Sequence, residues 1–137
     1  MKEDCIFCKI AKGEIHSATV YEDSHFTVIL DVNPATKGHC LIIPKEHFDN
    51  IYDLDGETAG KLFALATCIS RAMNDALKCD GLNLVQNNGE VAGQTVNHFH
   101  LHLIPRYEGD GLNLNWPQQE ISGEQLEEIR LSIKKSI

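Results

Sequence analysis

The alternation of apolar and polar positions along the chain predicts strands in both halves of the sequence. Residues 18–22 and 25–31 are rich in β-forming residues and are separated by Asp23 and Ser24, which predicts a hairpin. Residues 39–44 form a third β-run, and its closing Pro44 is a residue that a central strand would not tolerate. Two further strands are expected at residues 82–86 and 97–106.

Helical periodicity is confined to two segments. Apolar residues recur at spacings of three and four over residues 58–79, where Asp55 is placed to cap the start and Gly81 to end the helix. Ser122 followed by Gln125 resembles a capping box for a short helix at residues 123–136. The order β-β-β-α-β-β-α predicts an α+β fold with an antiparallel sheet of about five strands.

Length and charge narrow the class of protein. The 137 residues fit a single domain, residues 1–137, and the formal net charge of −8 argues against a protein that coats nucleic acid. We expect no membrane span, because no run of ~18 apolar residues occurs. The N-terminus lacks the apolar stretch of a signal peptide, so we expect a cytoplasmic protein with reduced cysteines.

The most informative segment is 98–104, with the sequence HFHLHLI. In a strand, His98, His100 and His102 would share one face, and the apolar residues between them would pack on the core beside the long helix. A single histidine on a strand is more often just hydrogen-bonded or solvent-facing. Three in alternation need partners, because neutral rings must be hydrogen-bonded and charged rings repel, and a polyanionic ligand or a metal would supply them.

Two other features carry candidate chemistry. Gly89 and Gly93 permit a tight backbone that aims successive N–H groups at a phosphate, although a glycine turn between strands is usually only a hairpin. Cys5 and Cys8 have the two-residue separation that suits zinc, and taken alone the pair could equally be a redox motif or an accident. We expect the other three cysteines, Cys40, Cys68 and Cys79, to be small core residues.

These motifs together resemble the histidine-triad (HIT) family of nucleotide hydrolases and transferases. Segment 98–104 matches the family pattern His-φ-His-φ-His-φ-φ, and segments 37–44 and 89–96 also match it. The resemblance runs from Cys5 to about Arg106 and implies a HIT-like domain with one long helix and a short C-terminal helix.

The resemblance also implies roles for the histidines. His100 is expected to be the nucleophile that forms a nucleotidyl-histidine, His102 to contact phosphate oxygens, and His39 to support the triad from a neighbouring strand. Relatives that transfer nucleotides carry glutamine at the third triad position, so His102 favours hydrolysis. His47 and His98 would complete a structural zinc site, one zinc per chain, with Cys5 and Cys8.

The nucleotide is expected to meet a larger set of residues, again by resemblance. The ribose would bind Asp31, the base would lie between aliphatic side chains, and the phosphate would lie against the glycine turn. The residues assigned to nucleotide binding are Ile15, Ile29, Asp31, Val32, Asn87, Gly93, Gln94, Thr95, His100 and His102. By contrast, His16 and His25 are expected to be surface residues.

The resulting prediction is a hydrolase of purine nucleoside 5′-phosphoramidates or related substituted nucleoside monophosphates, with an AMP-like product. One alternative is a diadenosine polyphosphate hydrolase, and another is a zinc-stabilised nucleotide-binding or partner-binding module with incidental turnover. The resemblance further implies a homodimer packed through the long helix and an adjoining strand edge.

Overall fold

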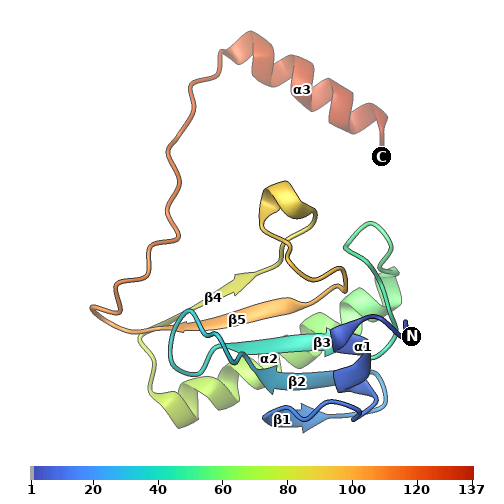
Figure 1. Ribbon diagram of the computed structural model, residues 1–137. Coiled ribbons are helices and arrows are strands. Elements are labelled where there is room, and N and C mark those ends of the chain that lie inside the picture. The colour runs from blue at the N-terminus through green and yellow to red at the C-terminus, as the bar shows by residue number, and fades with distance from the viewer. Residues whose placement is uncertain (1) are drawn as a thin grey trace.

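Five antiparallel strands form one sheet in the computed structural model, which describes residues 2–137 (Figure 1). The strands are β1 (Thr19–Glu22), β2 (Phe26–Leu30), β3 (Cys40–Pro44), β4 (Gly81–Val85) and β5 (Leu101–Arg106). Their order across the sheet is β1-β2-β3-β5-β4. The predicted hairpin is confirmed, since β1 pairs with β2 across a turn in which the Asp23 carboxylate accepts the N–H groups of His25 and Phe26.

The expectation that Pro44 keeps its strand out of the sheet centre is wrong. β3 lies between β2 and β5, and Pro44 is its last residue, opposite Phe26. A proline at the final position of a strand ends the ladder there instead of interrupting it. The ladder between β2 and β3 reaches Pro44, whereas the ladder between β3 and β5 stops at the pair Ile42 and Leu101.

The long helix α2 (Gly56–Leu77) covers one face of the sheet (Figure 1). Its Asp55 cap is confirmed, because the carboxylate accepts the Thr58 N–H at 2.9 Å. The predicted end was wrong: Lys78 caps the helix in a left-handed conformation with φ 52°, and Gly81 instead begins β4. The buried residues of α2 pack on alternate residues of the sheet, including Phe99, Leu101 and Leu103, as the histidine segment predicted.

The opposite face of the sheet carries α1 (Ile6–Ala11), a helix that the sequence patterns missed. Cys5 caps it, and Phe7 packs with Ile29, Leu41 and Ile43 in a second, smaller apolar cluster. One turn of 3-10 helix, η1 (Glu90–Ala92), precedes the histidine segment. The expectation for the remaining cysteines holds for Cys40, which is buried, but Cys68 is exposed on α2 and Cys79 is only half-buried.

The chain leaves the sheet after β5 and runs through an extended arm to α3 (Gly123–Lys135). The predicted capping box is confirmed, because Ser122 accepts the Gln125 N–H and the Gln125 side chain accepts the Ser122 N–H. Within the described residues, no helix is long and apolar enough to cross a bilayer.

Candidate active site

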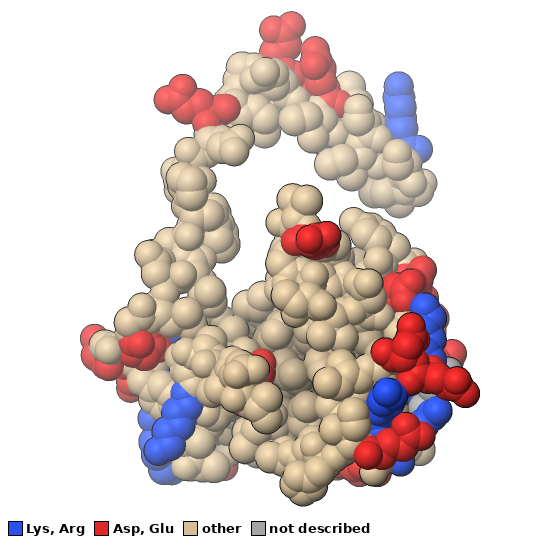
Figure 2. All heavy atoms as spheres, in the orientation of Figure 1, with Lys and Arg blue, Asp and Glu red and all other residues tan. Residues whose placement is uncertain are grey.

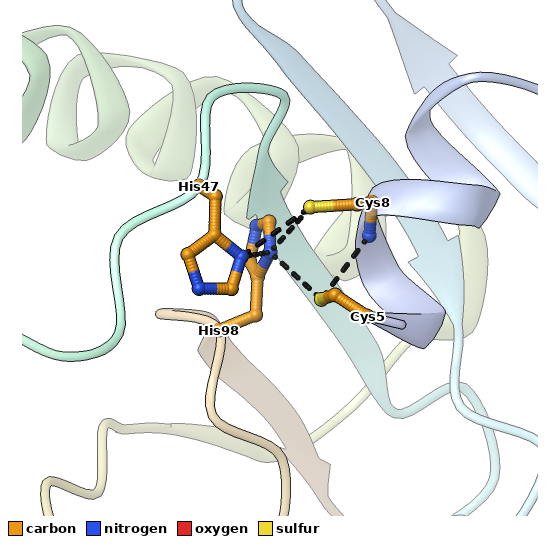
Figure 3. A group of neighbouring side chains, drawn as sticks. All are labelled: Cys5, Cys8, His47 and His98. Carbon is orange, nitrogen blue, oxygen red and sulfur yellow. Dashed lines mark hydrogen bonds between the residues drawn. The ribbon is translucent and has the colours of Figure 1, made fainter. Parts of the chain in front are cut away.

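Two cysteines and two histidines converge between α1 and the turn that follows β3 (Figure 3). Cys5 and Cys8 lie one helical turn apart at the start of α1, so their sulfur atoms face the same side. Their Sγ atoms each lie 3.3 Å from an imidazole Nδ1, that of His98 for Cys5 and that of His47 for Cys8. The two Nδ1 atoms are 3.1 Å apart, and all four ligand atoms lie within 4.8 Å of one another.

In both His98 and His47, the hydrogen bond made by Nε2 determines which ring nitrogen carries no proton. His98 donates its Nε2–H to the Pro44 carbonyl at 2.8 Å, and His47 donates its Nε2–H to the Asp49 carboxylate at 2.7 Å. In its neutral form, each ring would therefore present an unprotonated Nδ1 to the cysteines. Burial lowers the pKa of His98 to about 4, so its ring is neutral at pH 7.

This donor set could hold a metal ion. Two thiols and two bare imidazole nitrogens are a tetrahedral zinc set, in which neighbouring ligand atoms lie about 3.3–3.8 Å apart. Burial raises the pKa of the Cys8 thiol, so the charge of a cation is what would ionise it. Without a cation, two lone pairs would face each other between His47 and His98.

The three histidines of segment 98–102 do not all lie on the strand, as the alternation had predicted. β5 begins only at Leu101, because Phe99 donates its N–H to Phe48 of a neighbouring loop and His98 bonds the carbonyl of Pro44. The rings still gather on the side of the sheet that carries α1. Phe7 of that helix lies edge-on to His100, with ring centroids 4.9 Å apart.

His100 is held in one tautomer by the backbone of a metal-site residue. Its Nδ1–H donates to the carbonyl of His98 at 2.7 Å, which leaves Nε2 as the unprotonated nitrogen. The ring is 7% exposed, and burial lowers its pKa below the ordinary value. A neutral imidazole with a fixed bare nitrogen is a nucleophile at neutral pH.

His102 is oriented by a second chain of hydrogen bonds. The Ala35 N–H donates to His39 Nδ1 at 3.0 Å, so the proton of His39 resides on Nε2 and is donated to His102 Nδ1 at 2.9 Å. His102 therefore keeps its own proton on Nε2. Burial lowers its pKa to about 4, and His39 lies 3.7 Å from an Asp31 carboxylate oxygen. His39, which the resemblance implies as a support of the triad, is thus in direct contact with His102.

A cleft of about 470 Å³ opens beside these rings. Seven of the ten residues assigned to nucleotide binding line it: Ile15, Ile29, Asp31, Val32, Thr95, His100 and His102. Ile15 and Val32, which look like core residues in the sequence, are in fact 37% and 85% exposed. The lining of the cleft therefore combines aliphatic side chains with a carboxylate and imidazoles.

The other three assigned residues hold the preceding loop together instead of lining this cleft. Gln94 is buried and bonds Gly89, Asp49 and Val96 through its side-chain amide. The N–H of Gly93 is taken up by the Glu90 carbonyl, and the Asn87 side chain reaches the Gly93 carbonyl at 3.5 Å. The N–H groups of Gly93 and Gln94 are therefore used within the loop, and Thr95 is the residue of this turn that lines the cleft.

Sequence reasoning missed the part of the cleft that α1 supplies. On α1 these residues are Ile6, Phe7 and Ile10. Elsewhere in the lining, Ser17, Leu30, Asn33, Leu41 and Val96 were missed as well. The apolar residues flanking Cys5 and Cys8 at spacings of three and four were the available signal for this helix. His16 and His25 are both exposed, as predicted, but His16 also borders the cleft.

The fold is α+β, and its site has two parts. A cluster of two cysteines and two histidines could hold a metal ion, and beside it the imidazoles of His100 and His102, each fixed by a hydrogen bond, line a cleft. The HIT domain profile matches residues 12–109, and the chain belongs to the HIT family.

Relatives agree with this assignment. An adenosine 5′-monophosphoramidase of Schizosaccharomyces pombe is 37% identical over 97% of this chain and 98% of its own. The crystal structure of a HIT family protein from Bacillus anthracis has 45% identity and a TM-score of 0.93, covering 100% of this chain and 99% of its own. A zinc-bound histidine triad protein from Mycobacterium smegmatis has 38% identity and a TM-score of 0.77, covering 98% of both chains.

Proposed function

We propose that this protein hydrolyses purine nucleoside 5′-phosphoramidates through a nucleotidyl intermediate on His100. The observation that carries the proposal is the hydrogen bond from His100 Nδ1 to the His98 carbonyl, which leaves Nε2 bare and aims a neutral nucleophile from a buried position. The name of the S. pombe relative supports the choice of substrate class.

The reaction proceeds in two displacements at phosphorus. In the first, His100 Nε2 forms a bond to phosphorus and the phosphorus–nitrogen bond of the substrate breaks, so that the leaving nitrogen takes the electron pair and a proton. In the second, water attacks phosphorus, the bond to Nε2 breaks and a proton is released. The products are a nucleoside 5′-monophosphate and an amine or ammonia. Covalent catalysis of this kind replaces one difficult displacement with two easier ones.

His102 stabilises the charge that develops during both steps. Its Nε2–H is fixed by the contact from His39, and its ring centroid lies 4.9 Å from that of His100 on the same side of the chain. A donor held in this position hydrogen-bonds the phosphoryl oxygens without reorganising. The family trend at this position, histidine in hydrolases and glutamine in transferases, agrees with water as the acceptor.

The cleft suits a nucleoside monophosphate in its arrangement of polar and apolar walls. The aliphatic side chains of Ile15, Ile29 and Val32 line the cleft and would contact a flat base. The Asp31 carboxylate also lines it and would accept hydrogen bonds from ribose hydroxyls. Purine and ribose recognition rest on these contacts.

We further propose that Cys5, Cys8, His47 and His98 hold one structural zinc ion. Bound zinc would supply a fixed positive charge that ionises the thiols and pins His98. Its effect on the reaction passes through the chain itself, because the His98 carbonyl is the group that orients His100. The zinc-bound M. smegmatis relative supports this choice of metal.

An activity comparison tests the proposal against its alternatives. We expect release of AMP from adenosine 5′-phosphoramidate, loss of turnover by more than a thousandfold in His100→Ala, and full activity in the control His25→Ala, whose side chain is exposed and remote from the cleft. Faster cleavage of a diadenosine polyphosphate would identify the other HIT hydrolase class. Inactivity on both substrates with AMP still bound would identify a binding module.

A further inference from the structure

Cys5 and Cys8 differ in their access to solvent. Cys8 is 0% exposed, whereas Cys5 is half-buried and lines a surface hollow of about 380 Å³. Lys2 and Asp4 line the same hollow, and Figure 2 shows acidic and basic side chains gathered on the side of the molecule where the N-terminus and α1 lie. A small polar molecule can therefore reach Cys5 from water, whereas Cys8 is closed off.

The two cysteines are also close enough to bond to each other. Cys5 caps α1 and Cys8 follows three residues later, which separates their Cα atoms by about 5–6 Å, within the range that a disulfide spans. The Cys8 N–H donates to the Cys5 Sγ at 3.4 Å, and both sulfur atoms belong to the group of ligand atoms that lie within 4.8 Å of one another (Figure 3). A disulfide can therefore form with little movement of the backbone.

Both sulfur atoms contact a histidine that serves the active site. The Nδ1 of His98 lies 3.3 Å from the Sγ of Cys5 and 3.5 Å from the Sγ of Cys8. A disulfide carries no thiolate charge, so oxidation would leave only the imidazoles of His47 and His98 for a cation that needs four ligands. His98 would then lose its metal anchor, and its carbonyl is the group that orients His100.

We propose that a hydroperoxide oxidises Cys5 and Cys8 to a disulfide, that the site then loses its zinc, and that the reaction at His100 slows as a result. The inference rests on the proposed zinc site and adds to it a reversible reaction of the two thiolates. Exposure sets the order of attack, with Cys5 meeting the oxidant and Cys8 completing the disulfide.

The reaction balances in two steps, shown for hydrogen peroxide. The Cys5 thiolate attacks one peroxide oxygen, the O–O bond breaks, and uptake of one proton gives a sulfenic acid and water. The Cys8 thiolate then attacks the sulfur of the sulfenic acid, the S–O bond breaks, and a second proton gives a second water. Two electrons pass from sulfur to the peroxide. Dithiothreitol reverses the change by reducing the disulfide to two thiols.

Peptide mapping after peroxide treatment tests the disulfide. The peptide containing residues 5 and 8 should lose two hydrogen atoms, and the free thiols should fall from five to three. A zinc-binding dye should report release of one zinc per chain at the same rate, and dithiothreitol with added zinc should restore the starting state. Retention of all five thiols, a disulfide between any other cysteines, or zinc kept after oxidation would overturn the proposal. Zinc is measured before oxidation, so a metal-free protein would count against the zinc site alone.

Single variants test the order of attack. In Cys8→Ser, Cys5 should stop at the sulfenic acid, which dimedone traps, because the second thiolate is missing. In Cys5→Ser, Cys8 should react at least tenfold more slowly than Cys5 does in Cys8→Ser, because it is buried. Cys68→Ser is the matched control: Cys68 is exposed but lies outside the cluster, so zinc release should match the wild type. Equal dimedone labelling of Cys5 and Cys8 would contradict the assigned order.

Hydrogen exchange and turnover test the link to the active site. After oxidation, the backbone N–H groups of residues 98–100 should exchange faster, and AMP release from the phosphoramidate should slow at least tenfold, because His98 has lost its metal anchor. Both should recover with dithiothreitol and zinc. Unchanged exchange and unchanged turnover after complete disulfide formation would overturn this link.

Discussion

Replacing Cys8 with alanine tests whether the four-residue cluster holds zinc, and Cys40 provides a matched control. Both sulfur atoms are buried, with Cys8 0% and Cys40 2% exposed, but Cys40 lies in the α2-side core and Cys8 lies against His47 and His98. Truncating a buried cysteine to alanine costs about 1–2 kcal/mol through lost packing and a small cavity. Both variants share this loss of stability, so any additional destabilisation in Cys8→Ala reports the loss of bound metal.

The size of this additional destabilisation follows from the free energy that zinc binding adds to the folded state. At a free zinc concentration a thousand times Kd, binding stabilises the folded wild type by about 4 kcal/mol. If loss of the Cys8 thiolate weakens binding a thousandfold, the same zinc contributes only about 0.4 kcal/mol. For a chain of this length roughly 3–5 °C in Tm corresponds to each kcal/mol, so a chelator should lower the wild-type Tm by more than about 10 °C.

The assay is thermal unfolding in zinc buffer, with and without a chelator, combined with metal analysis of the purified protein. We expect the wild type and Cys40→Ala to lose the same number of degrees on chelation and to contain one zinc per chain. Cys8→Ala should be nearly insensitive to the chelator. A wild type that chelation does not destabilise, or a Cys8→Ala variant that responds as strongly as the wild type, would refute the metal site.

Three further predictions concern the cleft and the histidines. The free energy of unfolding should fall as the pH is lowered from 7 to 5, because the pKa of His102 is lowered to about 4 in the folded protein and the unfolded chain therefore binds more protons over that range. In urea unfolding of His102→Gln, this decrease in the free energy of unfolding should be smaller than in the wild type by about 1–2 kcal/mol. Val32→Asp should raise KM at least tenfold with unchanged Tm, whereas Val91→Asp, which is also exposed but lies outside the cleft, should leave KM unchanged. Asp31→Asn should weaken AMP binding more than binding of the 2′,3′-dideoxy analogue, as measured by calorimetry. Equal weakening of both ligands would remove the ribose assignment.

Sequence patterns predicted the sheet from short runs of β-forming residues, and α2 from apolar residues at helical spacing, of which Leu62, Ala66, Ile69 and Met73 are buried. Asp55 and Ser122 were also predictable, since N-caps act through their own local backbone. α1 was missed because it is only six residues long and because the sulfur atoms of Cys5 and Cys8 in its first turn meet His47 and His98, far away in the chain. The residues that α1 contributes to the cleft were therefore not predicted either.

The sequence identified which histidines form the site more accurately than it predicted their backbone conformation and hydrogen bonds. Alternation placed the rings on one side of the chain, but β5 starts only at Leu101, because His98 and Phe99 bond the carbonyls of Pro44 and Phe48. The tautomers of His98 and His100 depend on the carbonyls of Pro44 and His98, and no sequence pattern reports such contacts. The loop roles of Gln94 and Gly93 likewise depend on tertiary hydrogen bonds.

The account depends above all on His100 as the nucleophile. The most direct measurement is to quench the enzyme during turnover of adenosine 5′-phosphoramidate at alkaline pH and to map the adenylyl adduct by mass spectrometry. We expect one adduct per active chain on the peptide that contains His100, and its absence in His100→Ala. An adduct on His102 or on any other residue, or steady turnover with no adduct detected on a rapid-quench timescale, would contradict the assignment.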